Sequence, residues 1–383
     1  MNRLIIVGLA ISPPGTMGGN SKIMLEYARH LPMFMQTVFI LPSSKRPTYD
    51  SVARESRTEV IEVEDYSGSD KRHPVASVRH YTHELRRTFD RLGVTKNDFV
   101  LTSSESHIET VPLFFLQKDF GFQWLPSMFL FVPGPIENVR KRYGFPFLKY
   151  IVYYFYQRLM FLLQKARGSA FVVTNQSDFV RFPPRFKNRL YAAYGGVNIE
   201  QIPADCESCK KLYDAVFCSR LHPQKGVSRL LDIWRIVLDW KSDAKIAIIG
   251  NGDPSYEKFL KDKAQRLGLT DSIEWMGYVN GEEKYRVYRQ AKLLTHATIY
   301  DNNGMVAAEA LCTGLPVVMS DIPALRSLYT TGCRKVPYGD NSAFAEAILD
   351  PGVTLSAEDR DMLRKRWSWF NRAREFKAFL DCL

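Results

Sequence analysis

The sequence predicts an α/β protein with two domains, each a doubly wound parallel sheet covered by helices. The first observation is length, because 383 residues exceed one ordinary hydrophobic core and two domains of about 150 to 200 residues are expected. The second is an alternation of short β-branched runs with helix-forming stretches, which is typical of parallel sheets. The third is a polar stretch at residues 195–213, after which the alternation starts again. We therefore place the domain boundary there.

The first half alternates strands and helices from the N terminus onward. Short apolar runs predict strands, and longer stretches with apolar residues three or four apart predict helices. Strands are expected at residues 4–9, 37–41, 60–63, 98–102, 124–132 and 170–174, and helices at 21–31, 73–92 and 145–164.

A glycine loop at residues 15–20 separates the first strand from the first helix. Gly18 and Gly19 would let the backbone approach a phosphate or an acceptor closely. The loop is not G-x-G-x-x-G and no acidic residue stands at the dinucleotide position, which disfavours a nicotinamide cofactor.

The second half repeats the pattern. Strands are expected at residues 216–219, 245–249 and 273–276, and helices at 226–239, 255–267 and 282–291. Residues 298–321 then hold a loop with Asp301 and Gly304, a helix with Glu309, a glycine stop and a further strand. The two carboxylates bracket a helix N terminus, which favours an anion, and carboxylates accept hydroxyl hydrogen bonds. A ligand with phosphate and sugar hydroxyls would suit this segment, although a plain turn with a solvated Asp and a surface Glu is the alternative.

Two cations follow the strand at 216–219. Arg220 ends this strand, and Lys225 lies in the loop that Gly226 closes. Ligands bind outside the carboxyl ends of parallel strands, where Arg offers a bidentate fork and Lys a point charge, so a diphosphate is expected here. A solvated Lys and a surface Arg would be the structural alternative.

These segments resemble a known family. Residues 301–309 resemble the Glu-x7-Glu signature of retaining family 4 glycosyltransferases, with Asp301 in place of the first Glu. Residues 219–226 resemble that family's Gly-Arg-Leu-x-x-x-Lys-Gly element, and Gly250 lies in its Gly-x-Gly loop. The resemblance is strongest over residues 170–350. It implies the GT-B fold, two Rossmann-like domains facing a central cleft.

The resemblance also implies a reaction and roles. A sugar would pass from a nucleoside-diphosphate sugar to the hydroxyl of a glycan, lipid or small-molecule acceptor, with retention and without a metal or cofactor. Arg220 and Lys225 would neutralise the leaving diphosphate, Asp301 would bind the transferred sugar and Glu309 the ribose. The remaining binding positions would be the backbone of Gly304 and Met305 at the phosphate, Gly250 at the base or ribose, and Gly18 and Gly19 in the first domain.

The family pattern implies three regions. Residues 1–195 would form the acceptor-side domain, residues 196–366 the nucleotide-sugar-binding domain, and residues 367–383 a helix that crosses back to the first domain.

One departure concerns the acceptor face. Many relatives place a His-Gly or His-Asp pair where this chain has Val132, Pro133 and Gly134. His107 is the nearest substitute, and a surface histidine is an equal alternative. A non-catalytic paralogue that binds a nucleotide sugar or glycan is therefore the second hypothesis, ahead of a phosphorylase or an epimerase on the same fold.

The positive charge is unevenly distributed. The chain carries a net charge of +11, and residues 140–190 hold eleven basic side chains and one acidic one, a net of +10. The aromatic helix in this stretch would bind an anionic membrane surface or pack on the core with a solvated basic edge. Nucleic acid is disfavoured because no RNA-binding motif accompanies the charge.

Composition limits the remaining classes. Hydrophobic residues make up 45% and charged residues 24%, which fits a globular protein and excludes a disordered one. No run reaches the roughly 18 apolar residues of a membrane span, and the N-terminal run reads as a buried strand rather than a signal peptide. Cys206 and Cys209 form an isolated C-x-x-C pair, so reduced thiols are expected. The expected location is cytoplasmic, with peripheral binding to the cytosolic membrane face as the alternative.

Overall fold

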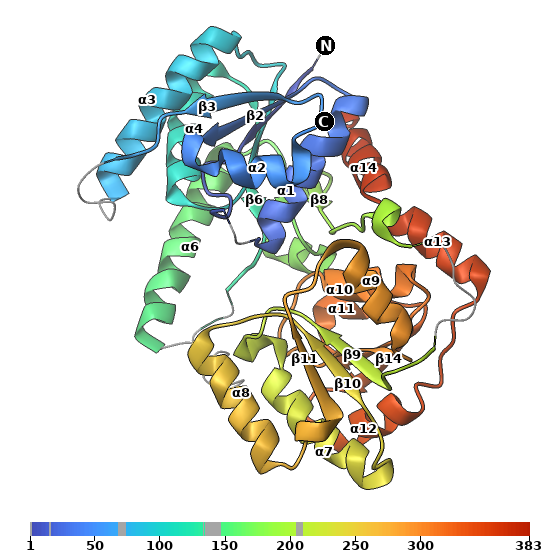
Figure 1. Ribbon diagram of the computed structural model, residues 1–383. Helices are drawn as coiled ribbons and strands as arrows, with labels where there is room; N and C mark the ends of the chain where they lie inside the picture. The colour runs from blue at the N-terminus through green and yellow to red at the C-terminus, as the bar shows by residue number, and fades with distance from the viewer. Residues whose placement is uncertain (1, 15–16, 68–73, 133, 135–146, 204–209) are drawn as a thin grey trace. The chain divides into compact units, whose positions relative to one another are not determined.

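The structure is a computed structural model that describes residues 2–14, 17–67, 74–132, 134, 147–203 and 210–383 (Figure 1). Gly15, Pro133, the Cys206–Cys209 pair and the start of the basic stretch therefore lie outside the described residues. The chain divides into two units. Unit 1 comprises the described residues up to Gly195 together with Trp369–Leu383, and unit 2 comprises Gly196–Ser368.

Unit 1 is built on parallel strands. One sheet has the order β3-β2-β1-β4-β5, and a second has the order β6-β7-β8. Every described pairing in both sheets is parallel. The strands are β1 (Leu4–Val7), β2 (Thr37–Pro42), β3 (Glu59–Val63), β4 (Phe99–Thr102), β5 (Gln123–Leu125), β6 (Ser127–Met128), β7 (Phe171–Val173) and β8 (Leu190–Ala192).

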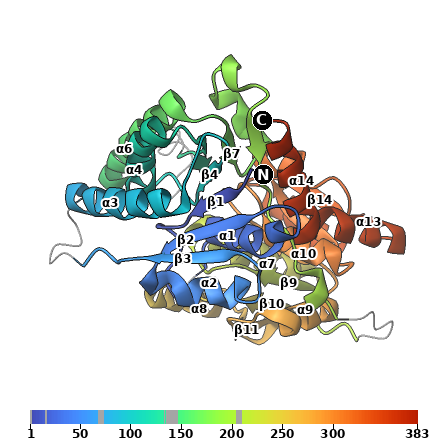
Figure 2. The same ribbon diagram turned by 90° about the horizontal axis from the view of Figure 1, so that it is seen from above.

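Helices cover both faces of the larger sheet in unit 1. Alternate side chains of each strand point to opposite faces, so β1 sends Leu4 and Ile6 into one core and Ile5 and Val7 into another. Helices α1 and α2 cover the first face, and α3 and α4 cover the second (Figure 2). The helices of this unit are α1 (Gly19–His30), α2 (Arg46–Ala53), α3 (Pro74–Leu92), α4 (His107–Phe120), α6 (Phe147–Arg167) and α14 (Trp369–Asp381).

Unit 2 has one parallel sheet with the order β11-β10-β9-β12-β13-β14. This is the strand order of doubly wound nucleotide-binding folds, in which the chain reverses direction across the sheet beside its first strand. The strands are β9 (Ala215–Cys218), β10 (Ile246–Ile249), β11 (Ile273–Gly277), β12 (Leu294–His296), β13 (Val317–Asp321) and β14 (Cys333–Pro337).

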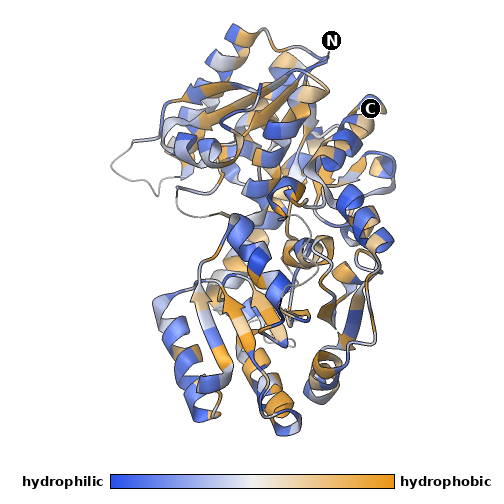
Figure 3. Cartoon of the chain, turned by 45° about the vertical axis from the view of Figure 1, so that its right-hand side comes forward, coloured by the Kyte–Doolittle hydropathy of each residue, from blue (hydrophilic) through white to orange (hydrophobic). Residues whose placement is uncertain are grey.

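The helices of unit 2 complete its core. The strands are mainly apolar, and the helices turn polar faces outward (Figure 3). Trp234 of α7 is fully buried, and its indole N–H donates to Ser272 Oγ at 3.1 Å. The helices are α7 (Val227–Trp240), α8 (Pro254–Arg266), α9 (Gly281–Gln290), α10 (Met305–Cys312), α11 (Pro323–Arg326), α12 (Asn341–Leu349) and α13 (Ala357–Trp367).

The prediction of an α/β protein with parallel sheets is confirmed, with three local corrections. The expected strand at 124–132 is wrong, because Pro126 has no N–H to donate and separates the short strands β5 and β6. Helix α4 was not expected at all, since it contains Pro112. Helix α2 was likewise not expected, whereas the helix expected at residues 367–383 is present as α14 (Trp369–Asp381).

The last helix, α14, belongs to unit 1. Phe376 stacks on Tyr27 of α1 with ring centroids 4.9 Å apart, and it also contacts Tyr191 at 5.0 Å. Trp369, Ala373 and further apolar residues of α14 lie in the same core as α1.

Candidate functional site

The candidate residues of unit 2 follow the two strands at its topological switch point. Strand β9 pairs with β10 on one side and β12 on the other, so the chain runs in opposite directions across the sheet from this point. The loop after β9 carries Arg220 and Lys225, and the loop after β12 carries Asp301 and Gly304. Because both strands end at the same edge, the topology brings cations and carboxylate together in the crevice where such folds bind ligands.

Glycines allow these loops to approach one another. Gly226 has φ +74°, and a Cβ there would lie 2.0 Å from the Ala297 carbonyl oxygen. A Cβ on Gly250 would lie 1.8 Å from the Ser219 carbonyl oxygen, beside Arg220. Neither position tolerates a side chain without moving backbone. Gly226 therefore fixes the Lys225 loop against the end of β12, and Gly250 supports the loop of Arg220.

Lys225 and Asp301 form an ion pair across the switch point. The Lys225 ammonium lies 2.7 Å from Asp301 Oδ2, and the side chains are 20% and 13% exposed. His296 Nε2 lies 3.4 Å from the same oxygen. Burial alone would raise the pKa of Asp301, but Lys225 and His296 hold it well below its usual range. The carboxylate is therefore ionised at neutral pH.

The other oxygen of Asp301 accepts hydrogen bonds from the turn that leads into helix α10. Asp301 Oδ1 accepts the backbone N–H groups of Asn303 and Gly304 at 3.2 and 3.1 Å. Gly304 has φ +59°, and Met305 begins the helix. The Gly304 N–H that the sequence assigned to a phosphate thus donates to a carboxylate of the chain itself. An incoming phosphate would have to replace Asp301 at both Lys225 and Gly304.

Glu309 is held by a residue that sequence reasoning missed. Lys284 of α9 lies 2.9 Å from Glu309 Oε1, and the two side chains are 10% and 5% exposed. A signal was present, because Lys284 shares the buried face of α9 with Tyr285, Val287 and Tyr288. A lysine on an apolar helix face needs a buried acidic partner.

Arg220 remains at the surface of unit 2. Its side chain is exposed, and no hydrogen bond or ion pair of this guanidinium is found among the described residues. Nearby, His222 Nδ1 accepts the Gln224 N–H at 3.2 Å and so shapes the loop. Burial, then the Arg220 and Lys225 charges, lower the pKa of His222. Arg220 is thus a guanidinium presented to solvent at the edge where a diphosphate would bind.

In unit 1, Gly18 and Gly19 form the entrance to α1. Gly18 is the N-cap residue, Gly19 begins the helix, and the Gly18 N–H donates to Ser12 Oγ at 2.9 Å. His107 begins α4, after the neighbouring strand β4. Its backbone N–H donates to the Tyr156 hydroxyl at 2.8 Å, and its Nδ1 lies 3.1 Å from the same oxygen. Burial lowers the pKa of His107, which favours the neutral imidazole.

A buried carboxylate, Glu109, joins the loops after β1 and β4. It accepts the Ala10 N–H at 2.8 Å, the Ser104 N–H at 2.9 Å and the Ser103 hydroxyl at 2.6 Å. Burial raises the pKa of Glu109 to about 7, although these hydrogen bonds oppose the shift. The sequence analysis did not single out Glu109, since a glutamate in a first helical turn is ordinary.

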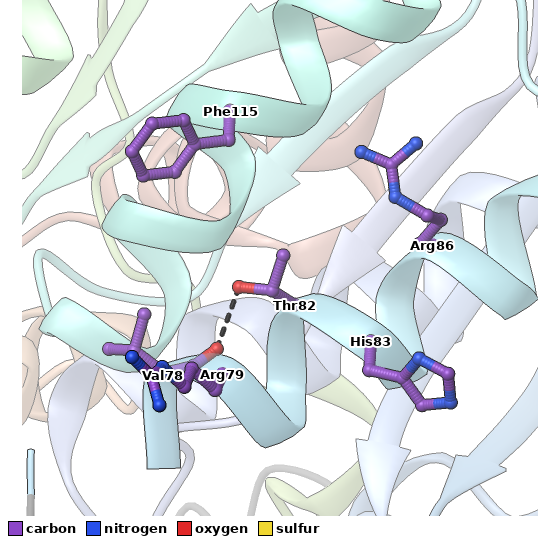
Figure 4. A pocket seen from close by; sticks show the side chains of 6 residues that line it. All are labelled: Val78, Arg79, Thr82, His83, Arg86 and Phe115. Atoms are coloured by element: carbon purple, nitrogen blue, oxygen red, sulfur yellow. Dashed lines mark hydrogen bonds between the residues drawn. The ribbon is translucent and has the colours of Figure 1, made fainter. Parts of the chain in front are cut away.

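Other features lie apart from these residues. A pocket of about 400 Å³ lies on α3 and α4 and contains none of the candidate residues (Figure 4). It is lined by Val78, Arg79, Thr82, His83, Arg86 and Phe115. Within the described ranges no cluster of three or more His, Cys, Asp or Glu residues could hold a metal ion. Among the same residues no helix is both long and apolar enough to span a membrane.

Comparisons with known proteins agree with this geometry. Residues 198–351 match the family model of glycosyl transferases group 1. The chain is similar to an uncharacterized glycosyltransferase of Methanocaldococcus jannaschii, with 32% identity over 170 residues, 42% of each chain. It is also similar to the phosphatidyl-myo-inositol mannosyltransferase of Mycobacterium leprae, with 33% identity over 38% of this chain and 37% of that one. The matched stretch is thus less than half the length of these relatives.

The fold as a whole also has a known counterpart. The structure of Anabaena HepE in complex with UDP-glucose matches all of this chain and all of that chain, with a TM-score of 0.73 and 15% sequence identity. At that identity the likeness establishes the fold alone. The chain therefore has the GT-B fold and carries, at residues 198–351, a glycosyl transferases group 1 domain of the family 4 type.

Proposed function

We propose that the protein is a retaining glycosyltransferase that moves a sugar from a nucleoside-diphosphate sugar to an acceptor hydroxyl. The observation that carries this proposal is the ion pair between Lys225 and Asp301 across the switch point of a parallel sheet. Arg220 lies in the same loop as Lys225, and Glu309 lies in α10, the helix that follows Asp301. Cations for a diphosphate and carboxylates for hydroxyls are the groups that a nucleotide sugar requires.

The chemical step breaks the bond between the anomeric carbon and the β-phosphate oxygen and forms one to the acceptor oxygen on the same face, while the proton of the acceptor hydroxyl passes to the leaving diphosphate. Negative charge develops on the leaving diphosphate, so Arg220 and Lys225 would stabilise the transition state more than the ground state. Lys225 is paired with Asp301. The diphosphate would take over this lysine, and the released carboxylate would accept hydroxyls of the transferred sugar.

The donor class follows from the same residues. Glu309 would accept the ribose hydroxyls, and Gly304 and Met305 lie at the helix terminus that favours phosphate. The UDP-glucose complex of HepE supports a uridine nucleotide as the first candidate. Thermal-shift screening of UDP-, GDP- and ADP-sugars tests the proposal. Stabilisation by one nucleotide class together with donor turnover supports it, and binding without turnover would favour the non-catalytic paralogue.

The exposed surface of helix α6 in unit 1 suggests that the acceptor is reached at a membrane surface. Helix α6 carries apolar side chains three and four residues apart that are between 54% and 76% exposed, here called the α6 apolar stripe: Leu148, Val152, Phe155, Leu159 and Leu162. Gln157 and Gln164, which are buried, lie about 200° around the helix from Leu159 and Leu162. The stripe therefore faces away from the core of unit 1, where a solvated helix would be polar.

Basic side chains accompany the stripe. Arg158 and Lys165 belong to the same helix, and Arg185 donates to the Lys165 carbonyl oxygen at 2.9 Å, which brings a further cation to the end of α6. An apolar stripe with neighbouring cations complements an anionic lipid surface, to which each such cation contributes about 1 kcal/mol. We propose peripheral binding there and a lipid-linked acceptor, as the name of the M. leprae relative also suggests.

Vesicle co-sedimentation tests the membrane proposal. The chain should bind vesicles that contain phosphatidylglycerol at low salt and should leave them at high salt. Phe155→Ser with Leu159→Ser, or Arg158→Glu with Lys165→Glu, should each abolish binding. Equal binding to neutral and anionic vesicles, or no binding, contradicts the proposal. A dimer in solution that Leu159→Ser dissociates would assign the stripe to a second copy instead.

A further inference from the structure

A buried ion pair joins helices α9 and α10 in unit 2. Lys284 and Glu309 are 2.9 Å apart, and less than a tenth of either residue is exposed. Desolvating two charges costs several kcal/mol, and a well-packed apolar pair of similar volume is often equally or more stabilising. Fold stability alone therefore gives little reason for a lysine at this position.

The pair lies beside the end of strand β9. Cys218 is the last residue of β9 and stands two positions before Arg220, and it lies near enough to Lys284 and Tyr288 to raise the pKa of both side chains. The Lys284 ammonium also lies 4.9 Å from the centroid of the Tyr285 ring. The pair therefore lies near the end of β9, where the loop that carries Arg220 and Lys225 begins.

Lys284 keeps its positive charge at neutral pH. Burial would lower the pKa of Lys284, but the Glu309 carboxylate, together with Cys218 and Tyr278, raises it overall. An ionised carboxylate accepts stronger hydrogen bonds than a protonated one. Without a cation beside it, a carboxylate as buried as Glu309 would take up a proton or turn away.

We propose that Lys284 is a positioning residue for nucleotide recognition, whose ammonium fixes the Glu309 carboxylate so that it accepts the 2′ and 3′ hydroxyls of the ribose. The inference rests on the proposed function, since ribose reaches Glu309 only if the donor is a nucleotide sugar. Lys284 acts through Glu309 and makes no contact with the reacting atoms. Its effect should therefore depend on the ribose hydroxyls and on nothing else in the ligand.

The experiment compares ribose and dideoxyribose ligands. Dissociation constants are measured by calorimetry for UDP, GDP and ADP and for the 2′,3′-dideoxy form of each. Lys284→Met should bind the preferred nucleotide about tenfold to a hundredfold more weakly than the unaltered chain does. The dideoxy form of that nucleotide should bind to Lys284→Met and to the unaltered chain with the same affinity. Lys284→Arg should restore most of the affinity. Lys263→Met is the matched control, because Lys263 pairs with Asp232 at 2.7 Å on α8 and α7 and is 18% exposed.

Each outcome decides the inference. An equal loss for both forms of the nucleotide, or no loss, overturns it. If Lys284→Met does not fold, Glu309→Gln is compared with Glu309→Gln/Lys284→Met, and a further loss of affinity in the double variant overturns the inference. If the unaltered chain binds none of the nucleotides, the proposed function fails and this inference with it.

Discussion

Replacing Lys225 with alanine separates the chemistry proposed for this residue from its part in the fold. Among the described residues, Lys225 makes one ion pair, at 2.7 Å to Asp301, and its side chain is 20% exposed. The substitution removes this pair and also the cation that would meet the leaving diphosphate. The Asp301 carboxylate would still accept the Asn303 and Gly304 N–H groups and would still lie near His296, so it would keep polar partners in the variant.

Two magnitudes follow. Loss of a hydrogen bond to a charged group costs about 1 to 3 kcal/mol of folding stability, and the remaining partners of Asp301 place the cost at the lower end. Loss of a preorganised donor to developing charge costs about 2 to 4 kcal/mol in the transition state, which is roughly a 30-fold to 1,000-fold fall in kcat. Turnover should therefore fall far more than stability, and the affinity for the donor should fall less than kcat.

The assay measures release of the nucleoside diphosphate at saturating donor, alongside urea unfolding. Lys263→Ala is the control, because Lys263 lies in the same unit, is 18% exposed and also makes a 2.7 Å ion pair, with Asp232. We expect a similar stability loss and normal turnover in this control. Normal turnover in Lys225→Ala, or an equal fall in both variants, would refute the assignment of Lys225 to the diphosphate.

Three further predictions concern carboxylates. Asp301→Asn should lower turnover more than donor affinity. Asp301→Glu tests whether the shorter aspartate side chain suits the donor of this chain, and a gain in activity on this substitution would show that aspartate does not. Glu309→Gln should weaken nucleotide binding about tenfold or more in calorimetry, and unchanged affinity would exclude Glu309 from the ribose site. Glu109 has a pKa of about 7 in the folded state, above its unfolded value, so the folded state binds a proton that the unfolded state has lost. The free energy of unfolding should therefore fall by about 3 kcal/mol as pH rises from about 4.5 through 7. Glu109→Gln should lose this slope in urea unfolding between pH 4.5 and 8, and parallel curves for the two chains would contradict it.

Much of the fold could be predicted because buried parallel strands appear in the sequence as short, continuous apolar runs. The fully buried residues of β1 and β9 read as continuous apolar runs, and glycines mark where several helices begin or end. The errors arose where one residue broke a local rule. Pro112 lies inside α4, and a single Pro126 divides two strands that the apolar pattern joins.

The candidate site could be located more readily than its internal contacts. The motifs placed Arg220 and Lys225 in a loop after one predicted strand, and Asp301 and Glu309 in the loop and helix after another apolar run. The pairing of Lys225 with Asp301 depends on which strands are adjacent, and on side-chain geometry that no motif encodes. The role of each residue in binding or turnover remains a prediction.

The contacts of Lys284 and Glu109 were beyond the sequence for the same reason. Lys284 meets Glu309 from a different helix, 25 positions earlier in the chain. Glu109 meets Ala10 from 99 positions away. Neither residue belongs to a motif. Only the apolar neighbours on its helix face distinguish Lys284 in the sequence, and only burial distinguishes Glu109 from an ordinary surface charge.

The central claim is tested most directly by proton NMR of the chain with UDP-, GDP- and ADP-sugars and a lipid extract. We predict that one donor is consumed, that its nucleoside diphosphate appears, and that the product keeps the anomeric configuration of the donor. Lys225→Ala should consume that donor at least about 30-fold more slowly. Consumption of none of these donors, or a product with inverted configuration, would contradict the account.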